Sequence, residues 1–127
     1  LAIVRRMIEE LDISTELVGV PIVREKDGLA SSSRNLRIDP DLRPQANTIY
    51  HCLKLAKKNW PVKTVQEIER EAVENLVNHG LRPEYCSLVN GTTLEPIHEK
   101  DPAESVVALV AAWLGKVRLI DNMIIKN

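Results

Sequence analysis

The chain has 127 residues, 44% of them hydrophobic and 28% charged, which is the size and composition of a single globular domain. Its 17 lysines and arginines against 18 aspartates and glutamates leave a net charge of −1, and its aromatic content is 3% with no phenylalanine. These values argue against a nucleic-acid or anionic-membrane partner, and the longest apolar run, 106–114, is far shorter than the roughly 20 residues that span a bilayer.

The first residues have the pattern of an amphipathic helix. Five apolar side chains recur at i, i+3 and i+4 spacing: Ile3, Val4, Met7, Ile8 and Leu11. No N-cap residue and no initiator methionine precede them, and interleaved acidic residues argue against a secretory signal. We therefore expect a chain that opens inside a helix of a longer protein.

The segment 16–23 predicts a β-strand. It is rich in β-branched residues and apolar on both faces, which is typical of a parallel strand covered on both sides. Pro21 cannot donate to a ladder and is expected near the end of the strand. The following Lys26-Asp27-Gly28 favours a turn in which Gly28 can take a positive φ.

The loop that follows, 27–35, carries three hydroxyls at Ser31, Ser32 and Ser33 and then the guanidinium of Arg34. Hydroxyls and backbone amides can donate to phosphate oxygens, and an arginine fork matches phosphate bidentately. Loops at the carboxyl ends of strands in open α/β sheets usually bind nucleotides. The loop is therefore a candidate site for the polyphosphate of ATP, and the alternative is an ordinary serine-rich surface loop.

Two helices are predicted next. Asp39-Pro40 favours an N-cap followed by proline at the first helical position, and an apolar stripe through Ile49, Leu53 and Ala56 continues this helix to about residue 58. Thr64 and Glu67 form a capping box for a second helix, which Gly80 ends. Its apolar face is expected to comprise Val65, Ile68, Ala72, Val73, Leu76 and Val77.

The remaining chain predicts an antiparallel sheet. Residues 85–89 alternate as a strand, 90–91 form a turn, 94–97 an irregular connection, and 105–113 and 116–123 two strands that close on Leu114-Gly115. Two helices on about three strands make an α+β unit. We expect residues 1–35 to be an α/β remnant, the last helix and strand of a doubly wound nucleotide-binding domain. Residues 36–127 are expected to form a small α+β lid domain with an antiparallel sheet and two helices.

Two stretches carry a longer pattern. The first is Val18-Gly19-Val20-Pro21-Ile22-Val23-Arg24-Glu25-Lys26-Asp27-Gly28-Leu29-Ala30, followed by Ser32-Ser33-Arg34-Asn35. The second is Ala111-Ala112-Trp113-Leu114-Gly115-Lys116 with Arg118-Leu119-Ile120-Asp121-Asn122. In this order they closely resemble the signatures of pantothenate synthetase (pantoate–β-alanine ligase). The resemblance covers essentially the whole chain, weakly between residues 36 and 101, and implies the C-terminal part of that enzyme.

The resemblance implies an ATP-dependent ligase of pantothenate biosynthesis. In this family ATP activates pantoate as an acyl-adenylate, and the β-alanine amine then displaces AMP. The serines and arginine that contact ATP phosphates correspond to Ser32, Ser33 and Arg34, with Ser32 and Arg34 expected to be catalytic. Val20 and Val23 correspond to the apolar strand end that cradles adenine. Family members usually carry methionine where this chain has Ser31, so that apolar contact is not carried over.

The same resemblance places other parts of the active site upstream of Leu1, including a His-x-x-His segment. It implies Mg²⁺ held by the ATP phosphates and by residues outside this chain. This chain itself is expected to contribute no metal ligand. We expect the chain to be inactive alone and the full-length protein to be a homodimer. Cys52 and Cys86 lack a C-x-x-C partner, which predicts free thiols in a cytoplasmic protein.

Several conspicuous residues have simpler interpretations. His51, His79 and His98 share no metal-ligand spacing, and His79 is expected to complement the dipole at a helix end. Trp60 and Trp113 are expected to pack in the core or at a hinge. The glutamates of the second helix are expected to form a solvated face. They are Glu67, Glu69, Glu71 and Glu74.

Arg118 and Asp121 are expected to form a strand-end ion pair, with the alternative that Lys116 or Arg118 reaches the nucleotide when a lid closes. For the loop, we expect Arg24 to Asp27 to be anchored and Gly28 to Ser33 to be mobile without ATP. Two function classes stay open: a part of an ATP-dependent ligase, or a non-catalytic α+β interaction module. Only the first predicts that Arg34 and the serines line a cleft with Val20 and Val23.

Overall fold

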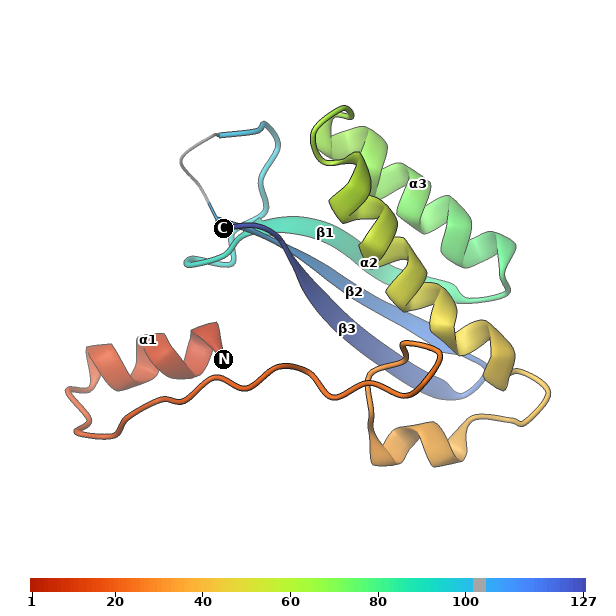
Figure 1. The fold of residues 1–127 in the computed structure, drawn as a ribbon, viewed down its shortest axis with the longest axis horizontal. Coiled ribbons are helices and arrows are strands. Elements are labelled where there is room, and N and C mark those ends of the chain that lie inside the picture. Colours follow the sequence, from red (N-terminus) through yellow and green to blue (C-terminus); the bar gives the residue numbers. More distant parts are fainter. Residues whose placement is uncertain (102–104) are drawn as a thin grey trace.

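The computed structural model describes residues 1–101 and 105–127 (Figure 1). A three-stranded antiparallel sheet lies against two helices, and a third helix lies apart at the N-terminus. The elements in chain order are α1 (Ala2–Glu10), the 3₁₀ helices η1 (Ser33–Arg37) and η2 (Arg43–Asn47), α2 (Thr48–Asn59), α3 (Val65–Asn78), β1 (Arg82–Asn90), β2 (Val106–Leu114) and β3 (Val117–Lys126). No helix in the described ranges is long and apolar enough to cross a membrane.

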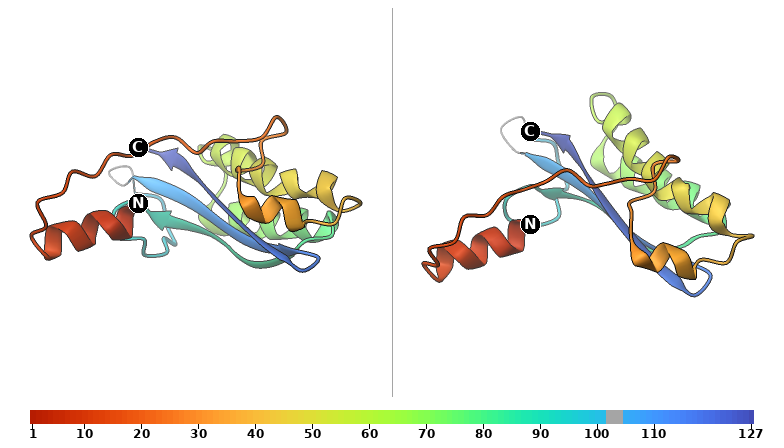
Figure 2. Two further views of the ribbon diagram at one scale, coloured as in Figure 1. Left: turned by 90° about the horizontal axis from the view of Figure 1, so that it is seen from below. Right: turned by 60° about the horizontal axis from the view of Figure 1, so that its bottom comes forward.

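The sheet has the order β1-β2-β3 and confirms the three predicted strands. β2 and β3 form a hairpin in which Leu114 pairs with Val117 across a two-residue turn (Figure 2). Gly115 takes the first turn position with a φ of 57°, which glycine adopts without steric cost and which a type II′ turn requires. The hairpin therefore fixes the register of β3, the strand that carries Arg118 and Asp121.

Helices α2 and α3 cover one face of the sheet, and the core lies between these two layers (Figure 1). Ile49 and Leu53 of α2 and Leu76 of α3 are at most 1% exposed, as is Val110 of β2. The helical and strand periodicities predicted these positions, whereas Val77, also expected on the apolar face of the second helix, is 54% exposed. The α+β unit expected after residue 36 is thus confirmed in its helices and strands.

The capping box of α3 forms as predicted. The Thr64 hydroxyl accepts from the backbone N–H of Glu67 at 3.3 Å, and the Glu67 carboxylate accepts from the backbone N–H of Thr64 at 2.8 Å. After the helix, Gly80 has a φ of 79° and no neighbour that a Cβ would meet. Backbone conformation, not crowding, therefore favours glycine at this helix end.

The prediction that a helix begins at Asp39-Pro40 is wrong. Asp39 instead starts a turn in which its carboxylate accepts from the N–H of Asp41 at 3.0 Å, and η2 leads into α2, which begins only at Thr48. Pro44 explains the difference. A helix from Asp39 would need an N–H at Pro44, where the ring has none and clashes with the preceding turn.

The strand expected over 16–23 is not formed. The segment is extended, but it pairs with no strand in the described part of the chain, and Val18, Val20 and Val23 are 70–79% exposed. A strand exists only through its ladder, and this segment and α1 lie outside the helix and sheet layers (Figure 1). The predicted helix is confirmed as α1, whereas the doubly wound domain remains a prediction.

Candidate functional site

The loop predicted to bind phosphate begins with a tight turn. The backbone N–H of Gly28 donates to the carbonyl of Glu25 at 2.9 Å, and the N–H of Glu25 donates to the carbonyl of Leu29 at 2.8 Å. Gly28 has a φ of 96°, as the sequence predicted for this position. The turn directs the chain back toward α2 and β3, so that Leu29 reaches the core and is 5% exposed.

The serines and Arg34 open the short helix η1. The Ser32 hydroxyl caps it by accepting from the backbone N–H of Arg34 at 3.2 Å, and Ser33 is the first residue of the helix. The side chains of Ser32, Ser33 and Arg34 are exposed. In the described part of the chain, no hydrogen bond or ion pair holds the Arg34 guanidinium, which leaves its donors available to a ligand.

A cavity of about 250 Å³ lies between this loop and β3. Its polar lining comprises Ser31, Ser32, Arg34, Asn35 and Arg118, and its apolar lining comprises Leu29, Ala30, Ile49, Leu119 and Ile120. The volume is below the roughly 300–1,000 Å³ of typical small-molecule pockets. The cavity can therefore hold a phosphate-sized part of a ligand with the remainder outside it.

Two arginines line the cavity, Arg34 from the loop and Arg118 from β3. Arg118 donates from Nε and Nη2 to the carboxylate of Glu84, each at 2.8 Å, and Trp113 donates to the same carboxylate. These hydrogen bonds, with Arg118 the largest cause, hold the pKa of Glu84 below its usual value. The ionised Glu84 fixes Arg118 at the cavity wall, and the net charge of the lining is positive.

The expected ion pair between Arg118 and Asp121 is wrong. Asp121 pairs with Arg24 at 2.5 Å, while Arg118 pairs with Glu84. Successive side chains of a strand point to opposite faces, so two residues three apart in β3 cannot share a face. Both residues form ion pairs, but with other partners than expected, and a contact of Lys116 or Arg118 with the nucleotide stays a prediction.

The cavity gathers only part of the predicted site. Ser32 and Arg34 line it, whereas Ser33, Val20 and Val23 do not, and the two valines are 79% and 73% exposed on the extended segment. Sequence reasoning missed the apolar lining from α2 and β3. Strand alternation gave one available signal, because Ile120 stands two residues after Arg118 and shares its face.

Polar contacts anchor both ends of the loop. Arg43 of η2 pairs with Glu25 and with Asp27, each at 2.6 Å, and Asn35 donates to Glu25 at 2.6 Å. The hydrogen bond from Asn35, followed by that from Arg43, lowers the pKa of Glu25, and Arg43 lowers the pKa of Asp27. These contacts agree with the expected anchoring of residues 24–27. Mobility of 28–33 remains a prediction, although Leu29 in this segment is buried and anchors it to the core.

The glutamate face of α3 is more than a solvated surface. Glu69 accepts from the backbone N–H of Leu88 at 2.8 Å, and Glu71 accepts from Lys63 at 2.5 Å. These two carboxylates reach donors on neighbouring segments, which a sequence pattern along one helix does not show, whereas Glu74 pairs with Arg70 on the exposed side of the same helix. His79 lies at the helix end as expected, with its Nδ1 2.8 Å from the carbonyl of Asn75.

The cysteines are free thiols, as predicted. Burial raises the pKa of Cys52 to about 11 and that of Cys86 to about 12, so both stay protonated near neutral pH. Within 1–101 and 105–127, no group of three or more histidine, cysteine, aspartate or glutamate side chains could hold a metal ion. Neither cysteine lines the cavity between the loop and β3.

Comparisons with known proteins identify the family. The family model described as "Pantoate-beta-alanine ligase" matches residues 1–124. The chain is 40% identical to the pantothenate synthetase of Thermotoga neapolitana over 131 residues, covering 97% of this chain and 44% of that protein. The chain thus spans less than half the length of the curated relatives it matches.

Solved structures agree with this match. The crystal structure of pantothenate synthetase from Thermus thermophilus superposes with a TM-score of 0.88 and 34% identity, covering 99% of this chain and 46% of that one. The ligase from Francisella tularensis, solved with a β,γ-ATP compound and β-alanine, has a TM-score of 0.64 and 23% identity over 96% of this chain and 38% of that one, a likeness of fold alone. The chain belongs to the pantoate–β-alanine ligase family.

Proposed function

We propose that the protein to which this chain belongs condenses pantoate with β-alanine through a pantoyl-adenylate, consuming ATP and releasing AMP and pyrophosphate. The observation that carries the proposal is the cavity that Ser32, Arg34 and Arg118 line, in a chain matched by the ligase family over residues 1–124. A positive, hydroxyl-lined cavity of this size suits a phosphate group. Within the whole enzyme, this chain would supply the phosphate-contacting loop and a lid.

The chemistry needs what these side chains offer. Formation of the adenylate moves negative charge onto the departing pyrophosphate and requires no protein nucleophile, so catalysis rests on positioning and electrostatic stabilisation. The Arg34 guanidinium can donate charge-assisted hydrogen bonds of about 1.5–3 kcal/mol each to these oxygens. The Ser32 hydroxyl already accepts from the Arg34 N–H, which leaves its own hydrogen to donate to phosphate. Ser33 would add an orienting contact from the first turn of η1.

Val20 and Val23 would take the adenine ring, because they are apolar side chains with little covering them. Mg²⁺ would be held by the ATP phosphates and by residues outside this chain, since the described residues provide no acidic ligand set. When bound, the ion would neutralise phosphate charge during adenylation. ATP and β-alanine are also the kinds of ligand present in the Francisella tularensis structure.

The test is pantoate-dependent exchange of labelled pyrophosphate into ATP by the full-length protein, followed by pantothenate formation when β-alanine is added. Exchange without pantoate, or no exchange at all, would contradict the proposal. A non-catalytic interaction module would bind no nucleotide in the same experiment. The chain alone is expected to be inactive. The full-length enzyme is expected to be cytoplasmic and to form a homodimer. Sedimentation of the purified protein would check the dimer.

A further inference from the structure

Arg24 and Asp121 form the most buried ion pair of the described chain. The guanidinium and the carboxylate meet through two parallel contacts, Nη1 to Oδ2 at 2.5 Å and Nη2 to Oδ1 at 3.1 Å. The Asp121 side chain is 3% exposed and that of Arg24 is 20% exposed. Asp121 also accepts from the backbone N–H of Asn122 at 2.8 Å, so a second contact within β3 holds its orientation.

The same guanidinium holds the turn that precedes the serines. Arg24 donates from Nη1 to the carbonyl of Gly28 at 3.0 Å, and its Cζ lies 4.4 Å from the centre of the Tyr50 ring. Gly28 packs flat against that ring, because a Cβ at this position would come within 2.1 Å of Tyr50 Cδ1. Arg24 thus joins three parts of the molecule: the loop, the helix α2 and the strand β3.

Stability alone does not account for such a pair. Desolvation of two charges can offset their attraction, and apolar replacements of buried pairs are often as stable as the pairs themselves. The best-attested advantage of a buried pair is that it specifies one arrangement. Here the pair joins the two segments that line the cavity. Asp121 lies on β3 three residues after Arg118, and Arg24 shortly precedes the loop 27–35 that carries Arg34.

We propose that Arg24 and Asp121 are positioning residues, whose ion pair fixes the serine–arginine loop against β3 so that Ser32 and Arg34 meet the outer phosphates of ATP together with Arg118. The inference rests on the proposed function. Neither residue of the pair lines the cavity, so each acts through the loop. Loss of the pair should therefore affect recognition of the outer phosphates and leave recognition of the rest of the nucleotide in place.

The experiment compares the binding of ATP and AMP to the full-length protein by calorimetric titration, for wild type, Asp121→Asn and Arg24→Lys. For Asp121→Asn we expect ATP affinity to fall by about 10- to 100-fold, as for a small misplacement of positioned groups, with AMP affinity close to that of wild type. Arg24→Lys keeps the charge but loses the fork, so its loss should be smaller. If Asp121→Asn does not fold, Arg24→Lys tests the positioning role instead, again by the loss of ATP affinity relative to the loss of AMP affinity.

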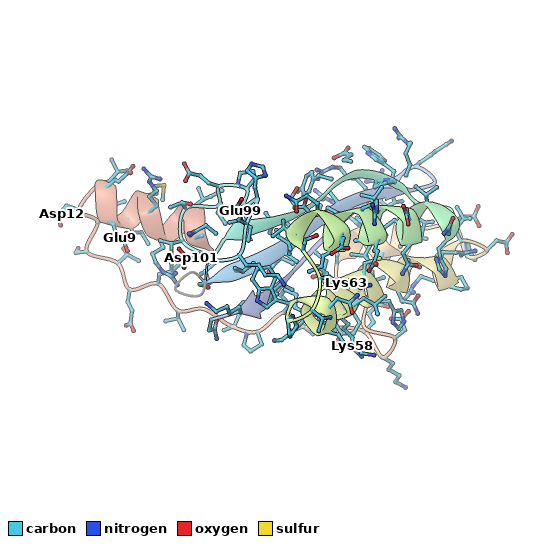
Figure 3. All side chains as sticks on the ribbon, turned by 90° about the horizontal axis from the view of Figure 1, so that it is seen from above. Glu9, Asp12, Lys58, Lys63, Glu99 and Asp101 are labelled. Atoms are coloured by element: carbon cyan, nitrogen blue, oxygen red, sulfur yellow. The ribbon has the colours of Figure 1, made fainter. Side chains whose placement is uncertain are left out.

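Glu71→Gln is the matched control. It makes the same carboxylate-to-amide change in the ion pair of Glu71 with Lys63, which involves no residue of the loop. Lys63 is labelled in Figure 3. This variant should keep both affinities. Equal losses for ATP and AMP in Asp121→Asn, or no loss in either pair variant, would overturn the positioning role while wild type stays active. A wild-type protein that binds no ATP would overturn the proposed function itself and the positioning role with it.

Discussion

Replacing Arg34 by alanine tests the candidate site most directly. The side chain is exposed, and its guanidinium has no protein partner in the described ranges, so the change should alter the free energy of unfolding by no more than about 0.5 kcal/mol. Its effect should fall on the reaction. Removing one preorganised donor to developing charge typically costs about 10²–10³ in rate, or about 2.7–4 kcal/mol.

The two half-reactions of the full-length enzyme should respond differently. The rate of adenylate formation, measured by pyrophosphate exchange, should fall by about 10²–10³ in Arg34→Ala. Attack of β-alanine on supplied pantoyl-adenylate should change much less, because no pyrophosphate is then present to stabilise. Arg34→Lys should recover part of the first activity, since a point charge lacks the planar fork.

Arg37→Ala is the matched control, because Arg37 is an exposed arginine of the same short helix η1 and does not line the cavity. It should retain both half-reactions. Equal losses of the two half-reactions in Arg34→Ala would refute the reasoning. Arg34 would then support the fold or the closure of a lid and would have no dedicated contact with the leaving phosphates.

Three further predictions concern stability and are measured by thermal unfolding. Gly28→Ala should destabilise by about 1–3 kcal/mol, because it places a Cβ against the Tyr50 ring at a φ of 96°; an unchanged midpoint would contradict the packing described. Thr64→Ala should cost about 1 kcal/mol through loss of the capping box, whereas Thr93→Ala, outside any helix, should cost less. Arg43 lowers the pKa of Asp27 in the folded state, so this contribution to stability is present above the unfolded pKa of about 3.9 and is lost as pH falls through the lower folded value. Arg43→Met should therefore flatten the acid limb of midpoint against pH, and an identical limb would show that the pair does not contribute.

Local signals predicted most of the α+β unit correctly. The capping box of Thr64 and Glu67 and the hairpin at Gly115 depend on neighbours within a few residues, and both formed as expected. The start of α2 was predicted wrongly although its cause is equally local, because Pro44 cannot donate the N–H that a helix from Asp39 would need. The parity of Arg118 and Asp121 on β3 would also have separated the two residues from sequence alone.

What sequence could not predict depends on partners far along the chain. The segment 16–23 has the composition of a buried strand, but pairing and cover must come from other segments, and the described chain provides neither. Composition reports what a segment can bury, whereas its partners decide what it does bury. The proposed contact of Val20 and Val23 with adenine has the same dependence, because both side chains need a second surface to complete a pocket.

The contacts of the loop 27–35 also depend on residues far along the chain, and sequence alone did not predict them. The sequence predicts that this loop ends one domain and that a second domain begins at residue 36, and that boundary remains a prediction. The contacts of the loop nevertheless lie on the α+β side: Arg24 reaches Asp121 across 97 residues of sequence, Arg43 holds Glu25 and Asp27, and Leu29 is buried in the core. The start of the loop is thus tied to the sheet that carries Arg118. Movement of residues 28–33 on ATP binding would then take place from an anchored base, which limits how far Arg34 can lie from the cavity.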